Sequence, residues 1–316
     1  MPERTAAGHV LGKGVAQPTA LFQEHYLLPS TVHGAIWPLS RDYPKPRHFH
    51  AQLELLVLVR GRAQVRIGRT LHTAHAGQLV WHLPGVEHVL HEASADCDLR
   101  VLHIEPDLCA AVVREVAPLA PAASHPVTRT ASLFDWTRPL GELASGRPVV
   151  ELKQRDRDLL LDQCDATCVD PALSASEVSA RLRAALSTAL RATLSDHDDQ
   201  RALSLVELAS CLLLENPGLE RAQVCRALDV SEGYLSRRFQ LELGISFSEQ
   251  RARSRICRFV SQVARNGTSY LEAALESGFG SYSQLHRSFT QIVCTSPRAY
   301  FSPTLRNLRA NRLTYQ

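Results

Sequence analysis

The sequence predicts an α+β protein, with an antiparallel β-barrel near the N-terminus and an all-α domain at the C-terminus. The first observation is a series of short alternating apolar runs between residues 53 and 105, each closed by turn residues. The second is an internal repeat of two short helices within residues 201–316. We therefore expect a barrel domain at 1–110, connecting helices at 111–200 and a helical domain at 201–316.

The barrel strands are indicated by the residues that end them. Gly61, Gly68, Gly77 and Gly85 each close a run with strand character, and glycine permits the tight turns between neighbouring strands. The expected strands are LELLVLVRG, RAQVRIG, TLHTAHAG, QLVWHLPG, HVLHEA and CDLRVLHIE. Strands this short and this closely spaced favour antiparallel pairing.

The helical domain contains one pattern twice. Cys225 aligns with Ala274 at an offset of 49 before the turn, and Arg237 aligns with Arg287 at an offset of 50 after it. The other aligned pairs are Asp229 with Gly278, Val230 with Phe279, Ser231 with Ser281, Leu235 with Leu285, Phe239 with Phe289 and Ser246 with Ser296. One residue inserted in the second turn explains both offsets. A single helix from Phe247 to Arg265 is expected between the copies.

Each copy has the features of a helix-turn-helix unit. In the second copy, Leu271, Ala274 and Leu275 are expected to form the buried stripe of a helix that ends at Gly278. The next helix begins at a Ser281 cap and presents small polar side chains and an arginine outward. That outward set is typical of a helix that reads DNA.

This second copy resembles the second helix-turn-helix of the AraC/XylS family of transcription regulators. The residues that match at the family's spacing are Ala274, Gly278, Phe279, Ser281, Arg287, Phe289, Ser296, Pro297 and Tyr300. Leu285, Cys294 and Phe301 stand where the family often has Phe, Gly and Arg, and Phe259 replaces a small residue. The resemblance implies a sequence-specific regulator whose partners are double-stranded promoter DNA and RNA polymerase. An activator is the working expectation, although the residues do not distinguish activation from repression.

The two recognition helices supply the expected DNA contacts. Joined by a rigid helix, they can enter successive major grooves about 10 bp apart. The candidate residues are Ser231, Glu232, Ser236, Arg237 and Arg238 on the first helix and Ser281, Ser283, Gln284 and Arg287 on the second. Arginine favours guanine and glutamine favours adenine, while Arg238 is expected to reach phosphate. The connecting helix presents Arg251, Arg255 and Arg258 on one face, either to phosphate or to solvent.

The barrel contains a second resemblance. His48-Phe49-His50 is followed by Glu54, and His88 comes later, after a Pro-Gly turn. This HxHxxxE pattern with a later histidine resembles the cupin superfamily, in which the corresponding side chains converge inside the barrel. The resemblance implies a divalent metal site formed by His48, His50, Glu54 and His88. Imidazole and carboxylate ligands suit Fe(II), Mn, Ni or Zn.

A small-molecule effector pocket is the alternative use of the same interior. Sensor domains of AraC-like regulators often keep this skeleton without holding a metal. The pocket would be lined by His48, His50, Glu54, Trp81 and His88, with the effector itself unknown. The remaining histidines of the barrel are interpreted as strand residues rather than ligands: His72, His75, His82, His91 and His103.

The connecting region is expected to hold two helices. The first lies within residues 151–169, and the second begins at a Ser174 or Ser176 cap. The second helix carries an apolar stripe formed by Val178, Leu182, Ala185, Leu186, Ala189 and Leu190. By resemblance these helices form a homodimer, but the stripe would serve equally well to pack against the barrel. A loop at 117–126 and a hinge at 195–201 complete the region.

Composition limits the class of protein. Residues 201–316 hold 15 Arg, no Lys and 9 acidic residues, a net charge of +6 against +3 for the whole chain, which suits contact with a polyanion. The 8 cysteines lack CxxC spacing, so neither a zinc knuckle nor a disulfide framework is indicated. No apolar run approaches the roughly 20 residues of a membrane span, and no signal peptide is visible. We therefore expect a cytoplasmic protein without membrane contact.

An enzyme is not expected, because no nucleophile–base pair and no cofactor-binding loop is visible. The competing hypothesis is a cupin metalloenzyme fused to a DNA-binding tail. It requires a tightly held metal with an open coordination position.

Overall fold

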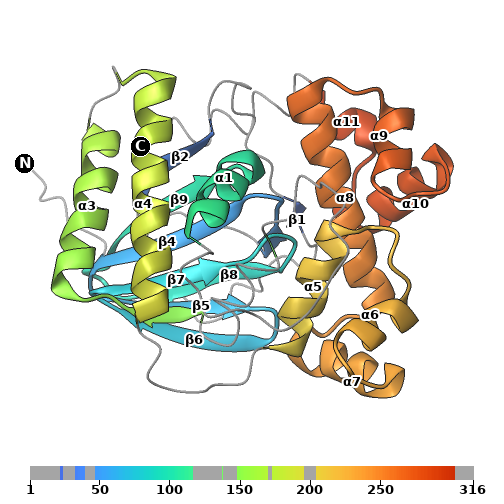
Figure 1. Ribbon diagram of the computed structural model, residues 1–316, viewed down its shortest axis with the longest axis horizontal. Coiled ribbons are helices and arrows are strands. Elements are labelled where there is room, and N and C mark those ends of the chain that lie inside the picture. The colour runs from blue at the N-terminus through green and yellow to red at the C-terminus, as the bar shows by residue number, and fades with distance from the viewer. Residues whose placement is uncertain are drawn as a thin grey trace, which may run out of the picture.

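The computed structural model describes residues 22–23, 33–39, 47–116, 137, 148–169, 173–195 and 204–302. A two-sheet barrel occupies the centre, with helices on two opposite sides of it (Figure 1). The loop predicted at 117–126 and all but the first residue of the hinge predicted at 195–201 lie outside the described residues. No helix in the described ranges is long and apolar enough to cross a membrane.

The barrel consists of two five-stranded sheets. The first has the order β1 (Phe22–Gln23), β3 (His48–Phe49), β8 (His88–Ala93), β5 (Arg62–Ile67) and β6 (Thr70–His75). The second has the order β10 (Val149–Glu151), β7 (Gln78–His82), β4 (Leu53–Arg60), β9 (Asp98–Ile104) and β2 (Gly34–Leu39). All pairs are antiparallel except β1 with β3. The α+β class and the antiparallel barrel are thus confirmed. The sequence did not predict three of these strands, which are β1, β2 and β10.

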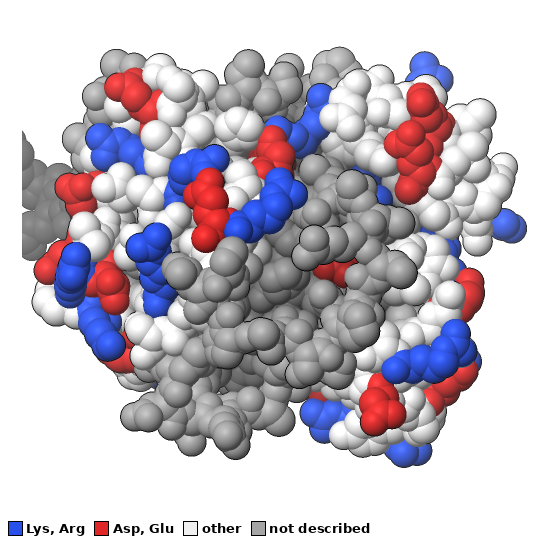
Figure 2. Space-filling view, in the orientation of Figure 1, with Lys and Arg blue, Asp and Glu red and all other residues white. Residues whose placement is uncertain are grey.

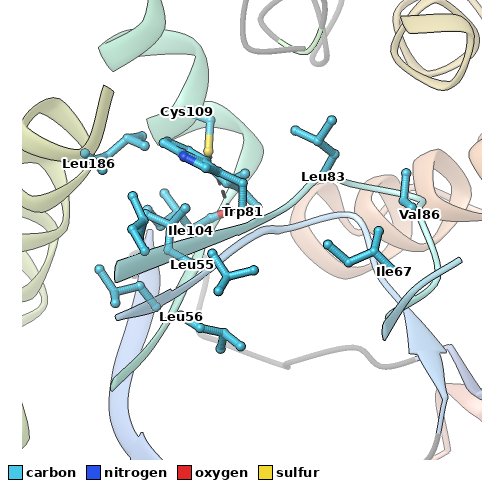
Figure 3. Packing of buried hydrophobic residues seen from close by; sticks show 14 of the residues in the cluster. Leu55, Leu56, Ile67, Trp81, Leu83, Val86, Ile104, Cys109 and Leu186 are labelled. Atoms are coloured by element: carbon cyan, nitrogen blue, oxygen red, sulfur yellow. Dashed lines mark hydrogen bonds between the residues drawn. The ribbon is translucent and has the colours of Figure 1, made fainter. Parts of the chain in front are cut away.

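Three helices cover the outer face of the second sheet. They are α1 (Pro106–Val116), α3 (Gln154–Val169) and α4 (Ala175–Ser195). Helices α3 and α4 form the side of the molecule opposite the C-terminal helices, and α1 lies between α4 and α8 (Figure 1). Trp81 points outward from this sheet toward Cys109 of α1 and Leu186 of α4 (Figure 3). The predicted apolar stripe of α4, with Leu182 and Leu190 fully buried, therefore packs against the chain's own barrel and helices.

The C-terminal helices lie on the other side of the barrel (Figure 1). They are α5 (Leu205–Glu215), α6 (Arg221–Ala227), α7 (Glu232–Glu242), α8 (Phe247–Asn266), α9 (Tyr270–Glu276), α10 (Tyr282–Val293) and α11 (Pro297–Tyr300). The pairs α6–α7 and α9–α10 are the two predicted helix-turn-helix units, and α8 is the predicted connecting helix. Each recognition helix starts where the sequence predicts, at a serine cap that accepts from the N–H group three residues on.

The backbone confirms the predicted repeat. Val230 N–H donates to Cys225 O at 3.0 Å, and Phe279 N–H donates to Ala274 O at 3.0 Å. Donor and acceptor of the second bond each lie 49 residues after those of the first, which is the offset predicted before the turn. Gly280 is the inserted residue of the second turn, since the serine cap follows it directly.

Two left-handed positions of the repeat carry a residue other than glycine. Asp229 has φ 52° where the second copy has Gly278, and Cys294 has φ 58° where the first copy has Gly244. Each copy thus keeps glycine at one left-handed position and replaces it at the other. A non-glycine residue in this conformation brings Cβ close to its own carbonyl oxygen, which costs about 1 kcal/mol.

Two departures from the family pattern compensate each other. Phe259 and Phe301 are both buried, and their ring centroids lie 6.1 Å apart in an edge-to-face contact. Phe301 also packs against Tyr270 and Tyr300. The larger residue on α8 therefore fills space together with the aromatic residue that follows α11.

The predicted stripe of α9 is wrong in part. Leu271 and Leu275 are 57% and 50% exposed, and α9 instead buries Ala273 and Ala274. The small alanines let α9 approach α8 and α10 closely, and their position rotates both leucines toward solvent. The pattern of large apolar residues was therefore a poor guide to the buried face of this short helix.

The barrel and the first helix-turn-helix unit share one continuous apolar core. It includes Leu53 and Val65 of the barrel, Leu213 of α5, and Leu235 and Phe239 of α7. The second unit has a separate core around Phe259, Leu285 and Phe289. The two copies of the repeat are therefore packed differently, although their backbones correspond.

A buried acidic group also joins the two domains. Glu105, which directly follows β9, accepts from Gln52 Nε2 at 3.1 Å, and its Oε2 lies 3.4 Å from Arg265 Nη1 of α8. Burial raises the pKa of the Glu105 carboxyl to about 7, with Asp107 adding to the rise and Gln52 and Arg265 opposing it. Glu105 therefore exchanges a proton near neutral pH.

We expect Cys294→Gly to stabilise the protein by about 1 kcal/mol, because glycine adopts the left-handed conformation without the Cβ contact. Gly267→Ala is the matched control, since Gly267 has φ 64° and a Cβ there would meet nothing within 4 Å. It should destabilise by a similar amount. Urea denaturation measures the free energy of unfolding of both variants. A lower value for Cys294→Gly than for the wild type would show that Cys294 is not strained in its left-handed conformation.

Glu105→Gln should change how stability depends on pH. Above about pH 4.5 the unfolded chain has released this proton, whereas the native protein retains it up to about pH 7. Native stability therefore falls as pH rises through this window, by an amount on the order of 3 kcal/mol. Glutamine cannot ionise, so the variant should gain that amount relative to the wild type between pH 4.5 and 8.

The exposed Glu92→Gln serves as the control for this substitution. Its free energy of unfolding, measured by urea denaturation at each pH, should change with pH as that of the wild type does. If Glu105→Gln also follows the wild type, Glu105 does not titrate in this window.

Candidate metal centre and nucleic-acid interface

A cluster of histidines around Glu54 lies between the two sheets of the barrel. The first sheet contributes His48 and His88, which are paired directly opposite each other. The second sheet contributes Glu54 at its centre, flanked by His82 on β7 and His103 on β9. His50 lies on the segment between β3 and β4. All of these side chains are at most 4% exposed.

The four residues predicted as metal ligands come together. The ligand atoms of His48, His50, Glu54 and His88 all lie within 4.8 Å of one another. The rings pack tightly, with centroid separations of 4.4 Å between His48 and His88 and 4.9 Å between His50 and His88. Three imidazoles and one carboxylate around a common centre form a donor set suited to a divalent first-row transition metal.

The hydrogen bonds of two ligands fix their tautomers. His50 Nδ1 lies 3.0 Å from Gln52 O, and His88 Nδ1 lies 3.0 Å from Val86 O. A carbonyl oxygen only accepts, so both Nδ1 atoms donate, and each Nε2 then carries a lone pair if the ring is neutral or a second proton if it is charged. Histidine ligands of metal ions are commonly oriented by such a hydrogen bond from the second nitrogen.

Those Nε2 atoms face the Glu54 carboxylate. His50 Nε2 lies 3.5 Å from Glu54 Oε2, and His88 Nε2 lies 3.5 Å from Glu54 Oε1. A lone pair opposite a carboxylate oxygen in a buried site is repulsive unless a proton or a metal cation lies between them. The arrangement is therefore complete only with positive charge at its centre.

Two histidines outside the predicted ligand set orient the carboxylate. His82 Nδ1 lies 2.7 Å from Glu54 Oε1, and His103 Nε2 is in hydrogen-bond contact with Glu54 Oε2. Burial lowers the pKa of His82 to about 4, assisted by the nearby charge of His88 and opposed by Glu54. A neutral His82 with its proton on Nδ1 donates to Glu54, and its buried Nε2 has no hydrogen-bond partner among the residues that the structure describes.

The charge of the cluster also determines the state of Glu54. Burial alone would raise the pKa of its carboxyl, but the charges of His103 and His88 outweigh this effect and hold the pKa well below the ordinary value. Glu54 is therefore the anionic centre of the site.

The structure extends one sequence interpretation in the barrel and corrects another. His82 and His103 are strand residues outside the ligand set, as expected, but both also contact Glu54, whereas His72, His75 and His91 lie at or near the surface. Trp81, a candidate pocket residue, points to the opposite face of its strand, where its indole N–H donates to Thr193 Oγ1 at 3.2 Å. Only the pairing register, in which Glu54 lies opposite both His82 and His103, could have identified the two histidines.

The recognition helices α7 and α10 present most of the predicted DNA contacts to solvent. Arg237 and Arg287 occupy equivalent positions, are exposed, and have no carboxylate partner among the described residues. Glu232, Ser283 and Gln284 are also exposed. The buried faces consist of the equivalent pairs Leu235 with Leu285 and Phe239 with Phe289. Each recognition helix thus packs on the domain through its apolar face. Its opposite face presents an exposed arginine that has no carboxylate partner among the described residues.

Several candidate contacts already have partners within the protein. The Ser231 and Ser281 hydroxyls accept the capping bonds of their helices. Arg238 pairs with Glu242 at 2.6 Å, and Glu232 pairs with Arg221 at 2.8 Å. Gln284 Oε1 accepts from Gly280 N–H at 2.7 Å, which leaves its amide group to donate outward. Ser236 is half-buried.

The arginines of α8 hold the end of α5 rather than staying in solvent. Arg255 donates to Pro217 O at 2.8 Å, and Arg258 donates to Leu214 O at 2.7 Å. Arg251 pairs with Glu220 at 2.6 Å. Burial lowers the pKa of both Arg255 and Arg258 to about 10. These side chains therefore contribute to packing between the helices. The sequence predicted that they contact either phosphate or solvent, and neither prediction describes these contacts.

The net positive charge of the C-terminal region does not form one basic patch on the face seen in Figure 2. Blue and red side chains are interspersed over the helices at the right of that view (Figure 2). On this face, individual arginines rather than a uniform surface field would contribute the electrostatic attraction to a nucleic acid.

Two family models match the sequence. The model described as "AraC-like ligand binding domain" matches residues 33–163, and the model described as "Helix-turn-helix domain" matches residues 224–302. The first covers the barrel with its cluster, and the second covers most of both helix-turn-helix units. No curated protein matches the sequence.

Solved structures similar to this chain include transcription regulators and a cupin. ToxT of Vibrio cholerae is 13% identical, with a TM-score of 0.41, over 84% of this chain and 96% of that one. The AraC-like transcriptional activator CuxR is 16% identical, with a TM-score of 0.33, over 69% of this chain and 70% of that one. A Cupin 2 conserved barrel domain protein of Salinispora arenicola is 21% identical, with a TM-score of 0.21, over 27% of this chain and 70% of that one. TM-scores this low carry no functional argument.

Proposed function

Since this chain belongs to the AraC family of transcription regulators, we propose that its barrel senses a divalent metal ion and its two recognition helices read promoter DNA. The family gives a ligand-binding domain and a helix-turn-helix domain. The metal, the residues that contact DNA and the partner proteins are the proposal.

The observation that carries the metal proposal is the Glu54 centre. Imidazole Nε2 atoms of His50 and His88 face its carboxylate at 3.5 Å while their Nδ1 protons are held by backbone carbonyls. His48 completes the ligand set, and His82 and His103 orient the carboxylate. A divalent cation satisfies all these groups at once, whereas without a metal the Nε2 atoms need protons of their own to face the anion.

The DNA proposal is supported by the equivalence of the two arginines. Arg237 and Arg287 project from the same position of α7 and α10 and are not neutralised within the described chain. Arginine binds guanine O6 and N7 with two hydrogen bonds, and glutamine binds adenine, so Arg287 with Gln284 suits a G/A-containing half-site. Ser236 and Ser283 are the small neighbours that would let the helices enter the groove, and Arg238 would exchange Glu242 for a phosphate.

The proposed partners are a second copy of the chain and RNA polymerase, with the cytoplasm as the compartment. The apolar face of α4 is occupied within the chain, so a dimer would use the outward face of α3, where Leu159 is exposed. Sedimentation of the full chain with and without metal tests the dimer.

The competing cupin metalloenzyme would need substrate access to the buried centre and turnover, which an activity assay of the metal-loaded protein would detect.

We expect purified full-length protein to bind about one Fe, Mn, Ni or Zn ion per chain, measured by elemental analysis. His50→Ala removes one ligand and should abolish stoichiometric binding. His91→Ala, at an exposed position on β8, is the control and should keep the metal. A wild-type protein that stays metal-free after incubation with each of these ions would rule out metal sensing and leave a small-molecule effector.

Selection from random DNA should enrich a motif of two blocks about 10 bp apart, one for each recognition helix. Arg237→Ala and Arg287→Ala should each weaken binding by about 5- to 150-fold, equivalent to about 1–3 kcal/mol, and relax the sequence of one block only. Arg114→Ala, which removes an exposed charge from α1, should leave the motif intact. No enriched motif, with or without metal, would refute sequence-specific binding.

A further inference from the structure

The segments that carry the cluster ligands also contact the C-terminal domain. Phe49 lies between His48 and His50 in sequence, and the guanidinium of Arg253 on α8 lies 5.5 Å from its ring centroid. Glu87 precedes His88 and pairs with Arg253 at 3.2 Å, with both side chains at most 4% exposed. Because side chains alternate along extended chain, the ligands face the barrel interior while Phe49 and Glu87 face α8.

The turn between β7 and β8 connects the same two regions. Gly85 N–H donates to His50 O at 2.8 Å, and Gly85 O accepts from Gln250 Nε2 of α8 at 3.0 Å. The next carbonyl, Val86 O, accepts from His88 Nδ1 at 3.0 Å. This turn therefore contacts two cluster histidines on one side and α8 on the other.

The hairpin between β5 and β6 extends the connection to the first recognition helix. Gly68 N–H donates to Glu87 O at 2.7 Å, and Arg69 N–H donates to Glu242 O, at the end of α7, at 2.7 Å. The fit is close, since a Cβ on Gly68 would lie 2.6 Å from Glu242 O. Ile67 is paired with His88, so the end of α7 is attached to the strand that carries a ligand.

We propose that this contact surface, formed by Phe49, Arg69, Gly85 and Glu87 against α7 and α8, transmits metal binding to the DNA-binding domain. The inference rests on the proposed metal site. One ion would draw the ligand atoms, now within 4.8 Å of one another, toward a common centre, because imidazole nitrogen and carboxylate oxygen bind such ions at about 2.1 Å. Phe49, Gly85 and Glu87 adjoin the moving ligands directly, so α8 and the end of α7 follow.

The DNA-facing side chains remain uncovered in this arrangement. Arg237 and Arg287 are exposed while the barrel holds α7 and α8. The barrel therefore controls the position of the recognition helices and does not block them. Metal binding changes how well both helices fit their half-sites at the same time.

Hydrogen–deuterium exchange of full-length, chelator-treated protein tests the proposal, with Zn²⁺ and Mn²⁺ as probes. In the wild type either ion that binds should change exchange rates in α8 and the last turn of α7 by about fivefold or more. In Glu87→Gln the ion should still bind, measured by calorimetry, but the change in these helices should fall below about twofold. Glu92→Gln, at an exposed position on the same strand, should respond like the wild type.

Arg253→Met provides a second variant if Glu87→Gln folds poorly, because it removes the charge from the other side of the pair while filling similar volume. It should also bind metal and lose the response. An ion that binds the wild type without changing exchange in α7 and α8 would overturn this inference and leave the metal site intact. A full response in both variants would show that the signal takes another route. Failure of both ions to bind would overturn the inference together with metal sensing.

Discussion

The buried carboxylate of Glu54 is the constraint on which the barrel depends. It lies at the centre of the second sheet, and histidines from neighbouring strands of both sheets converge on it. A charge in this position is tolerated only if it is compensated by hydrogen bonds or opposite charge. The register of β7 and β9 places His82 and His103 beside Glu54, where both contact its carboxylate. The same anion favours positive charge at the centre of the cluster.

Much of the fold could be predicted from local signals. Glycines at strand ends located the barrel strands, and the two Ser-Leu-Arg-Phe sets located both recognition helices. Two failures have clear causes. The stripe of α9 was assigned to leucines because size suggests burial, whereas close helix packing there requires Ala273 and Ala274. Strand β10 is three residues long, and it exists because β7 offers an edge to pair with, which no local pattern reveals.

The candidate site shows the same limit. His48, His50, Glu54 and His88 could be found because their spacing follows a known pattern, but His82 and His103 are distant in sequence and join Glu54 only through strand register. Trp81 was misplaced because its side of the strand depends on that same register. Likewise, Phe259 and Phe301 each looked anomalous alone, and only their contact across the second unit explains them. Residues that depend on a tertiary partner could not be interpreted singly.

The shared core has a consequence for how the chain unfolds and evolves. Apolar side chains of the barrel continue without interruption into α5, α6 and α7, whereas the second helix-turn-helix unit packs around its own cluster. The cooperative unit therefore crosses the boundary between the two matched family models. Replacing the DNA-binding half with that of a relative would change one side of this shared apolar core. Substitutions on the exposed faces of α7 and α10 leave the core intact. We therefore expect such substitutions to change operator specificity more readily than the exchange of whole domains.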